Sequence, residues 1–225
     1  MPTRAKAVVF DVNETLTDLS PLTHTFVDFG APRELARTWF AALLRDAFAL
    51  TVTADQPSFA DIAEHNARLL LQNMKLAVSL DEAVSAVLQR LSTLGPHPDM
   101  VHAVRQLQAG GFRLFTLSNG TTATAERLFR ESGVGSCFEQ LLSVDRHTLW
   151  KPAREAYERV ATVTGVALAD SILVAVHPWD IHGATRAGMK TAWLNREMNS
   201  YPAYFESPTI SIGSLAELAE NLHGQ

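Results

Sequence analysis

The chain contains a single cysteine, Cys137, among its 225 residues. One cysteine cannot form an internal disulfide, so the sequence excludes the small disulfide-stabilised secreted folds and favours a reducing compartment. A lone cysteine is typical of a small buried apolar position and does not by itself indicate a site.

The chain also lacks long hydrophobic runs and an excess of positive charge. No stretch approaches the roughly 18 apolar residues that a membrane span needs, and the apolar run in MPTRAKAVVFD is too short for a signal peptide. The net charge of −5 does not suggest a basic surface for nucleic acid. We therefore expect a soluble cytoplasmic protein that binds neither a membrane nor nucleic acid.

Strand and helix patterns divide the chain into three parts. AVVF at residues 7–10 predicts a buried strand, whereas residues 20–94 show helical periodicity with almost no strand signal. Gly95-Pro96-His97-Pro98 is the clearest boundary. Beyond it the patterns alternate, with predicted strands at 112–117, 141–144, 171–176, 190–194 and 209–212 and predicted helices at 100–109, 122–132, 154–164, 181–187 and 214–221.

This order predicts an α/β fold in which a parallel sheet carries helices on both faces. The first strand joins the same sheet as the later ones, so residues 1–16 and 96–225 form a core domain. Residues 17–95 form a helical cap inserted after the first strand. Within the cap we expect helices after Pro32, at 58–71 and at 79–91, the last with Ser79 and Glu82 as a capping box.

Polar side chains follow four of the predicted strands. Asp11 follows the first, Ser118 the second and Lys151 the third, and Asp180 comes after the fourth. Each is common in an ordinary turn when it is taken alone. Because ligands of open parallel sheets bind beyond the carboxyl ends of the strands, their convergence at one edge indicates an active site.

An N-terminal Asp, an inserted cap, a Ser at a strand end, a Lys-Pro and a late Asp resemble the four motifs of the haloacid dehalogenase superfamily. LSNG (117–120), KPAREAY (151–157) and PWDIHGA (178–184) are most similar to the type II, or (S)-2-haloacid, dehalogenases. The resemblance implies a Rossmann-like three-layer sandwich with a helical cap. It also implies a hydrolase that acts on small 2-haloalkanoic acids without a cofactor.

In that chemistry Asp11 attacks the halogen-bearing carbon, Lys151 keeps the nucleophile ionised, and Asp180 orients and deprotonates the hydrolytic water. Thr15, Ser118 and Asn119 would hold the nucleophile or the substrate carboxylate. By resemblance, the substrate site is also lined by further residues: Asn13, Tyr157, His177 and Trp179.

Asn13 separates dehalogenation from phosphoryl transfer. Phosphatases of this superfamily carry a second Asp at that position as a general acid, a role that Asn cannot fill. Ala175 and Val176 stand where such enzymes place another acid, so one nucleophilic Asp and Asp180 make a poor magnesium site. Two alternatives stay open: a magnesium-dependent phosphatase and a catalytically silent binding protein.

Three departures from the dehalogenase motifs leave the substrate open. The family carries an aromatic residue where Asn13 stands and an arginine near Phe40, a place that Arg37 or Arg45 would fill. His177 replaces an Asn and is expected to pair with Asp180, to add a cation, or to make a structural hydrogen bond. Dimers are common in this family, which suggests a homodimer.

Overall fold

The computed structural model describes residues 5–145 and 149–223. Within these ranges the strands are β1 (Ala7–Phe10), β2 (Arg113–Ser118), β3 (Phe138–Ser143), β4 (Ser171–Ala175), β5 (Lys190–Leu194) and β6 (Ile210–Ile212). The helices are α1 (Ser20–Asp28), α2 (Leu35–Val52), α3 (Phe59–Leu71), α4 (Leu80–Ser92), α5 (Met100–Ala109), α6 (Thr122–Glu131), α7 (Arg154–Thr164), α8 (Pro178–Ala187) and α9 (Leu215–His223), with short 3-10 turns η1 (Gly135–Cys137) and η2 (Leu168–Asp170).

The strands form one parallel sheet in the order β3-β2-β1-β4-β5-β6. The chain starts in the middle at β1, moves outward through β2 and β3, and then returns to build β4, β5 and β6 on the other side. The strand order therefore reverses beside β1, which is where open α/β sheets place their ligands.

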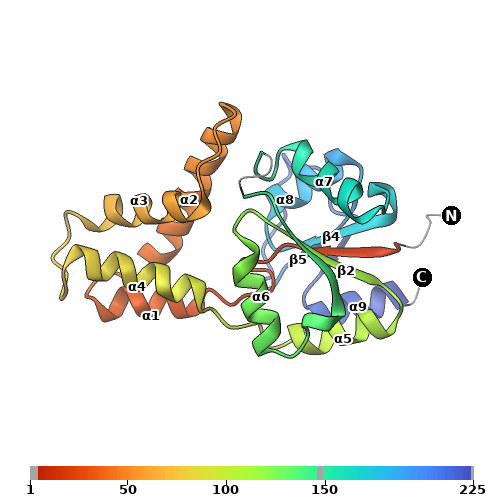
Figure 1. The fold of residues 1–225 in the computed structure, drawn as a ribbon, viewed down its shortest axis with the longest axis horizontal. Coiled ribbons are helices and arrows are strands. Elements are labelled where there is room, and N and C mark those ends of the chain that lie inside the picture. Colours follow the sequence, from red (N-terminus) through yellow and green to blue (C-terminus); the bar gives the residue numbers. More distant parts are fainter. Residues whose placement is uncertain (1–4, 146–148, 224–225) are drawn as a thin grey trace.

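Helices cover both faces of the sheet, as the alternation predicts. Figure 1 shows α7 and α8 above the sheet and α5 and α9 below it. Along β1, Ala7 and Val9 point into the cluster that includes α7 and α8, whereas Val8 and Phe10 point into the cluster with α5, α6 and α9. A strand that is apolar on both faces is buried on both faces, so the predicted α/β sandwich is confirmed.

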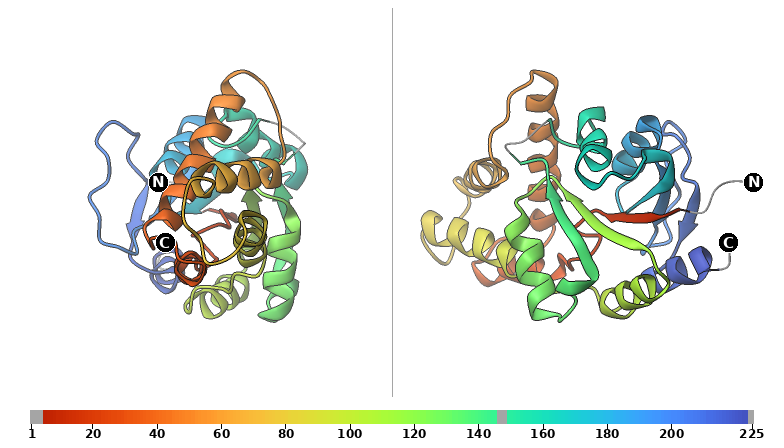
Figure 2. Two further views of the ribbon diagram at one scale, coloured as in Figure 1. Left: turned by 90° about the vertical axis from the view of Figure 1, so that its left-hand side faces the viewer. Right: turned by 45° about the vertical axis from the view of Figure 1, so that its right-hand side comes forward.

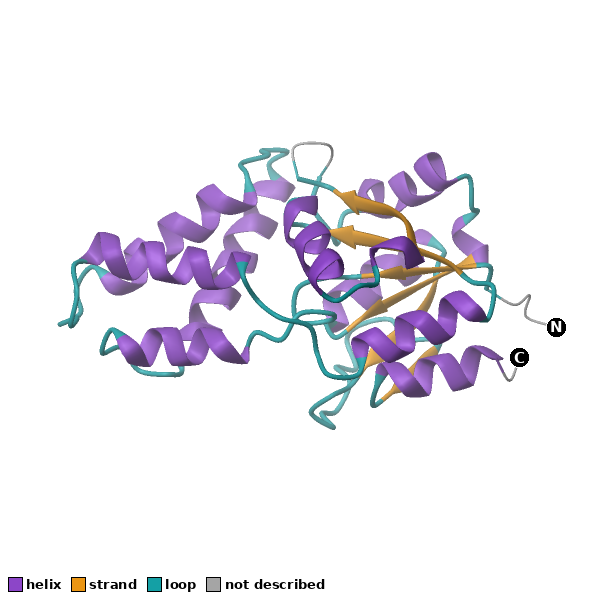
Figure 3. Cartoon of the chain, turned by 60° about the horizontal axis from the view of Figure 1, so that its bottom comes forward, coloured by secondary structure: helices purple, strands orange, loops and turns teal. Residues whose placement is uncertain are grey.

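Helices α1 to α4 form a helical insert beside the carboxyl ends of the strands (Figures 1 and 3). The two chain segments that connect it to the sheet run side by side, with an antiparallel bridge between Thr17 and Pro96. The views in Figure 2 show the insert as a layer of its own. The division at residues 16/17 and 95/96 stays a prediction.

Local sequence signals set the helix starts within the insert. Ser79 and Glu82 form the predicted capping box at the start of α4. Ser58 begins α3 in the same way with Asp61. Each box satisfies backbone N–H groups that a helix start would otherwise leave unpaired.

Some predicted bounds are wrong by a few residues. The predicted helix 181–187 begins at Pro178, because proline is favoured at the first helical position, and Asp180 therefore lies in the first turn of α8. Strand β3 begins at Phe138, three residues before the predicted start. Across the described residues, none of the helices has the length and apolarity of a membrane span.

Candidate active site

Asp11 lies at the centre of the strand-end edge, directly after β1. Its backbone N–H donates to Val174 O of the neighbouring β4 at 3.0 Å, which fixes the residue at the sheet edge. The residue is 4% exposed. Lys151 Nζ lies 2.8 Å from Oδ1, and Thr15 Oγ1 donates to Oδ2 at 2.7 Å. Both carboxylate oxygens therefore have a donor.

Lys151 joins the two carboxylates of the site. Its ammonium lies 2.8 Å from Asp11 Oδ1 and 2.6 Å from Asp180 Oδ2, and the residue is 0% exposed. Burial alone would lower the pKa of Lys151, but the two carboxylates outweigh it and raise that pKa. The Asn119 side chain binds the backbone N–H and C=O of Lys151 at 2.9 and 3.2 Å. Asn119 thus positions the lysine.

Asp180 is fully buried on the far side of Lys151. Its Oδ2 binds the lysine, and its Oδ1 accepts from the Tyr157 hydroxyl at 2.7 Å. Burial raises the pKa of Asp180, assisted by the charge of Asp11 and only partly offset by Lys151. Burial also raises the pKa of Tyr157 well above its usual value, so the phenol stays a donor. The predicted group of Asp11, Lys151, Asp180 and Tyr157 is therefore brought together.

The electrostatics of Asp11 run in the opposite direction. Burial on its own would raise its pKa, but the charges of Lys151 and His177 hold the pKa of Asp11 well below its usual range. Asp11 and Asp180 share one lysine, yet the pKa of Asp11 is lowered and the pKa of Asp180 is raised. Neighbouring acids with pKa values shifted in opposite directions can take different roles in catalysis.

His177 stands on the other side of Asp11. Its Nδ1 lies 3.3 Å from Asp11 Oδ2, and its Nε2 lies 2.8 Å from Glu14 Oε2. The suggested pairing of His177 with Asp180 is wrong, because the two ring nitrogens face Asp11 and Glu14 instead. Burial would lower the pKa of His177, but the neighbouring carboxylates of Asp11 and Glu14 raise it to about 10.

Thr15 and Ser118 complete the rim of the strand ends. Thr15 Oγ1 accepts from Val176 N at 3.1 Å while it donates to Asp11, so the hydroxyl is fixed between β1 and the end of β4. Ser118 Oγ accepts from Gly120 N at 3.1 Å, in a turn that closes β2. Thr15 therefore contacts the nucleophile candidate directly, while Ser118 is held in its own turn.

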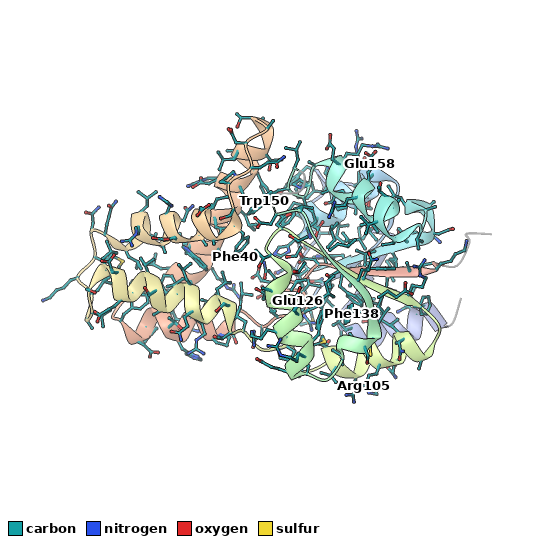
Figure 4. All side chains as sticks on the ribbon, viewed as in Figure 1. Phe40, Arg105, Glu126, Phe138, Trp150 and Glu158 are labelled. Carbon is teal, nitrogen blue, oxygen red and sulfur yellow. The ribbon has the colours of Figure 1, made fainter. Side chains whose placement is uncertain are left out.

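Aromatic residues of the helical insert reach the strand ends. Phe40 faces the His177 ring at a centroid distance of 6.5 Å, and Phe48 meets Trp179 edge-on at 5.0 Å. Trp179 also lies 5.0 Å from His177. Phe59 stacks on Trp150 at 5.7 Å; Figure 4 shows Trp150 and Phe40 at the junction between the insert and the sheet. These rings form an apolar wall over the site.

A cavity of about 1010 Å³ lies between the insert and the segment after β5. Glu14 and His177 belong to its lining, whereas Asp11, Lys151 and Asp180 do not. The Glu14–His177 pair therefore stands between the cavity and the Asp11 carboxylate. The lining is mixed in charge, with further cations and acids around it: Arg33, Arg37, Arg196, Asp18, Glu34 and Glu197.

The predicted arginines lie away from Asp11. Arg37 lines the cavity, but its guanidinium binds Glu197 at 2.7 Å. Arg45 binds its neighbour Asp46 at 2.7 Å and is absent from the cavity lining. Asn13 is half-buried on the loop after β1 and also lies outside that lining. Within the described residues, Phe40 and His177 occupy the place where an arginine was sought.

Two residues of the site carry no motif signal. Glu14 follows Asn13 in sequence, and only its backbone φ of 61° turns it into the left-handed region from which it reaches His177. Asp145 follows β3 and accepts from Phe59 N at 3.0 Å, so a core carboxylate caps the start of α3. The charge of each residue was visible in the sequence, but its direction was not.

The donor set at Asp11 favours a lysine-paired carboxylate over a metal site. No cluster of three or more His, Cys, Asp or Glu side chains suited to a metal ion occurs in residues 5–145 and 149–223. Lys151 Nζ bridges Asp11 and Asp180, the two acids that a magnesium ion would share.

The sheet order, the inserted helices and the Asp11–Lys151–Asp180 geometry agree with the resemblance seen in the motifs. The family model of haloacid dehalogenase-like hydrolases matches residues 5–188. The chain belongs to this family.

Relatives of this haloacid dehalogenase-like hydrolase match it over more than nine-tenths of its length. Haloacetate dehalogenase H-2 of Moraxella sp. (strain B) is 28% identical, covering 93% of this chain and 94% of that protein. (S)-2-haloacid dehalogenase H-109 of Pseudomonas putida is 26% identical over 96% of each chain. The structure of L-2-haloacid dehalogenase from Xanthobacter autotrophicus, with chloropropionic acid covalently bound, has a TM-score of 0.88 at 21% identity, covering 98% and 99% of the two chains. The last comparison confirms the fold.

Proposed function

We propose that the chain is a hydrolytic dehalogenase of small 2-haloalkanoic acids, of the haloacetate or 2-halopropionate type. The observation that carries the proposal is the Asp11 carboxylate, which is buried and paired with Lys151 at 2.8 Å. Its pKa is held well below the usual range, so it stays an anion and a nucleophile. The names of the relatives, haloacetate dehalogenase and (S)-2-haloacid dehalogenase, support the same chemistry.

In the first step an Asp11 oxygen attacks the carbon that bears the halogen, in line with the carbon–halogen bond. The new carbon–oxygen bond forms as the halide leaves with the bonding electron pair, and the product is an aspartyl ester. Halide is already a stable anion, so this step needs no general acid. Asn13 is therefore compatible with it, although it cannot protonate an alkoxide as a phosphatase acid does.

In the second step water attacks the carboxyl carbon of the ester. One water proton passes to a base, and the bond between the carboxyl carbon and the substrate oxygen breaks. The departing alkoxide oxygen takes the second proton of the water, so the hydroxy acid leaves and the Asp11 carboxylate is restored. Asp180 is the proposed base, because burial raises its pKa while the pKa of Asp11 is lowered. A base with a raised pKa accepts a proton more readily near neutral pH. Tyr157 would then stabilise Asp180 through its hydrogen bond.

The reaction is proposed to need no metal or other cofactor. Lys151 supplies the positive charge between the two carboxylates, and Thr15 supplies a neutral donor to the nucleophile. The phosphatase alternative requires an acid where Asn13 stands. The binding-protein alternative gives no reason for a buried Asp11–Lys151–Asp180 network, which costs desolvation energy.

The decisive test is halide release from chloro-, bromo- and fluoroacetate and from 2-chloropropionate, with EDTA present. The wild-type chain should release halide, and Asp11→Asn should reduce the rate by about 10⁴-fold or more, because the nucleophile is removed. A single turnover in heavy-oxygen water should label Asp11 before product. Magnesium-dependent phosphate release without halide from any haloacid would overturn the proposal.

We also propose that the enzyme acts in the cytoplasm as a homodimer. The single Cys137 suits a reducing compartment, and dimers are common in the family. Sedimentation equilibrium across a hundredfold concentration range tests the second statement. A single species at the mass of one chain, 24.6 kDa, would contradict it.

A further inference from the structure

Glu14 occupies a backbone position that normally favours glycine. Its φ is 61°, a left-handed conformation that costs most residues about 1 kcal/mol. His97 Nε2 contacts its carbonyl oxygen at 3.0 Å, and its N–H donates to Thr17 Oγ1 at 3.2 Å, so the surrounding loop fixes this conformation. The consequence is that the Glu14 side chain points toward His177.

The two ring nitrogens of His177 each face a carboxylate. Nε2 lies 2.8 Å from Glu14 Oε2, and Nδ1 lies 3.3 Å from Asp11 Oδ2. A neutral imidazole carries one N–H, so its other nitrogen would turn a lone pair toward an anionic oxygen. Only the imidazolium turns positive charge toward both carboxylates: Nε2 is hydrogen-bonded to Glu14, whereas Nδ1 is within ion-pair distance of Asp11 but makes no hydrogen bond. The raised pKa of His177, about 10, agrees with this geometry.

The charge of His177 offsets part of the negative charge at the inner site. Asp11, Asp180 and Glu14 are three carboxylates, and Lys151 supplies one positive charge between the first two. An imidazolium at His177 reduces the net charge of this group from two negative charges to one. It does so on the side that borders the cavity, from which an anionic substrate would approach.

The insert presents an aromatic ring to His177. Phe40 of α2 faces the His177 ring, and Trp179 lies on it at 5.0 Å. Other charged groups near His177 are engaged with different partners. They are Lys151 with Asp11 and Asp180, Arg196 with Asp99 and the Thr15 carbonyl, Arg37 with Glu197, and His97 with the Glu14 carbonyl.

We propose that Glu14 is a positioning residue that holds His177 as an imidazolium between the cavity and Asp11. His177 then supplies, from the core, the cation that meets the carboxylate of an incoming haloacid, at a site where the insert presents Phe40. The proposal rests on the proposed function for the identity of the anion. The pairing of Glu14 with His177 itself does not depend on it.

The pairing is tested without substrate by NMR of histidine-labelled protein. The His177 ring signal, assigned with His177→Asn, should titrate near pH 10 in the wild type. In Glu14→Gln, whose thermal unfolding is checked in parallel, the midpoint should fall by about one pH unit or more, because one of two carboxylates is lost. Glu34→Gln is the matched control: Glu34 is an acid of the same cavity that is not paired with His177, so its variant should leave the midpoint unchanged.

The role toward the anion is tested with acetate, an unreactive analogue, and with bromoacetate. At a pH between the two His177 midpoints, Glu14→Gln should bind acetate about tenfold more weakly, and the alkaline limb of kcat/KM should move with the NMR midpoint. An unchanged midpoint, or equal shifts in Glu14→Gln and Glu34→Gln, would overturn the proposal. If the midpoint and acetate binding shift but the wild type releases no halide, the proposed function fails while the positioning role stands.

Discussion

The two oxygens of the Asp11 carboxylate face different surroundings. On the Oδ1 side, Lys151, Asp180 and Tyr157 form a closed network with 0% exposure, and all three match the motifs of the family. On the Oδ2 side, His177 and Glu14 border a large cavity, and His177 departs from those motifs.

This difference separates two tasks. The lysine side prepares an ionised nucleophile and a base, and it does so with buried groups that the cavity does not reach. The histidine side is where an anion from the cavity would first meet a charge. The motifs therefore specify the nucleophile more strictly than the substrate, and each side can be tested by changes that leave the other intact.

The largest effect is expected on the lysine side. Lys151→Met removes the cation that Asp11 and Asp180 share and leaves two buried carboxylates without that ammonium. Breaking a buried ion pair in this way costs about 3–5 kcal/mol of unfolding free energy. Urea denaturation at pH 7 measures the change, and halide release should be lost with it. Adding Asp180→Asn should recover part of the stability, since one unpaired charge is removed; no recovery would mean that the loss comes from packing.

The histidine side should show its charge in the pH dependence of stability. The folded-state pKa of His177 is raised from 6.5 to about 10, so the folded protein holds a proton that the unfolded chain releases. The stabilisation is fully present below pH 6.5 and is lost as the pH rises toward 10. One proton gives a slope of about 1.4 kcal/mol per pH unit.

Urea denaturation of the wild type and of His177→Asn between pH 6 and 10 measures this slope. The difference between the two proteins should shrink as the pH increases. A constant difference over the whole range would show that His177 contributes packing but no charge.

The same division marks what the sequence could predict. The sequence predicts Asp11, Ser118, Lys151 and Asp180 at one edge because the carboxyl ends of parallel strands meet there, which is a property of the sheet order. The sequence does not predict that Asn119 holds Lys151. Its amide binds the backbone of the lysine, and the loop geometry sets that contact.

The arrangement of His177 and Glu14 could not be predicted from sequence patterns for a related reason. The sequence shows that residue 14 is acidic, but the side chain points toward His177 only because the backbone φ of Glu14 is 61°, which no periodicity encodes. The sequence suggests Arg37 or Arg45 as the cation of the substrate site because they lie on the same helix as Phe40. The structure gives both of them acidic neighbours, Glu197 and Asp46, and gives Phe40 the position facing His177.

A smaller effect on the lysine side follows from Gly183 of α8. A Cβ at this glycine would lie 2.5 Å from the Tyr157 hydroxyl oxygen and 2.7 Å from Pro152 Cβ. Gly183→Ala should therefore displace Tyr157 from Asp180 and cost about 1–3 kcal/mol. Alanine has a higher helix propensity than glycine and would by itself stabilise α8. A lower free energy of unfolding in Gly183→Ala would therefore come from the steric contact.

Gly95→Ala is the matched control, because a Cβ there meets no atom within 4 Å. Thermal or urea denaturation of both variants measures the difference. Tyr157→Phe in the Gly183→Ala background should lose less than the two single changes added together. Equal stability of Gly183→Ala and the wild type would show that α8 shifts freely and that the Tyr157–Asp180 contact does not depend on this close packing.

The smallest effects are expected at the outer end of the cavity. Arg37 and Glu197 form an ion pair with side-chain exposures of 81% and 59%, and exposed pairs of this kind contribute under about 1 kcal/mol. Arg37→Ala and Arg45→Ala should therefore both leave the unfolding free energy nearly unchanged. Arg37 lines the cavity and Arg45 does not. Removing Arg37 should raise KM for an anionic haloacid by about threefold at low salt, through weaker attraction, with kcat unchanged.

This difference should disappear at high salt, where charges at the cavity opening are screened. Steady-state halide release at 20 and 500 mM salt, with Arg45→Ala as the control, measures it. Equal KM values for the two variants would remove Arg37 from the path of the substrate. A drop in kcat for Arg37→Ala would instead place the arginine at the reacting centre and would return to the insert the cation that we assign to His177.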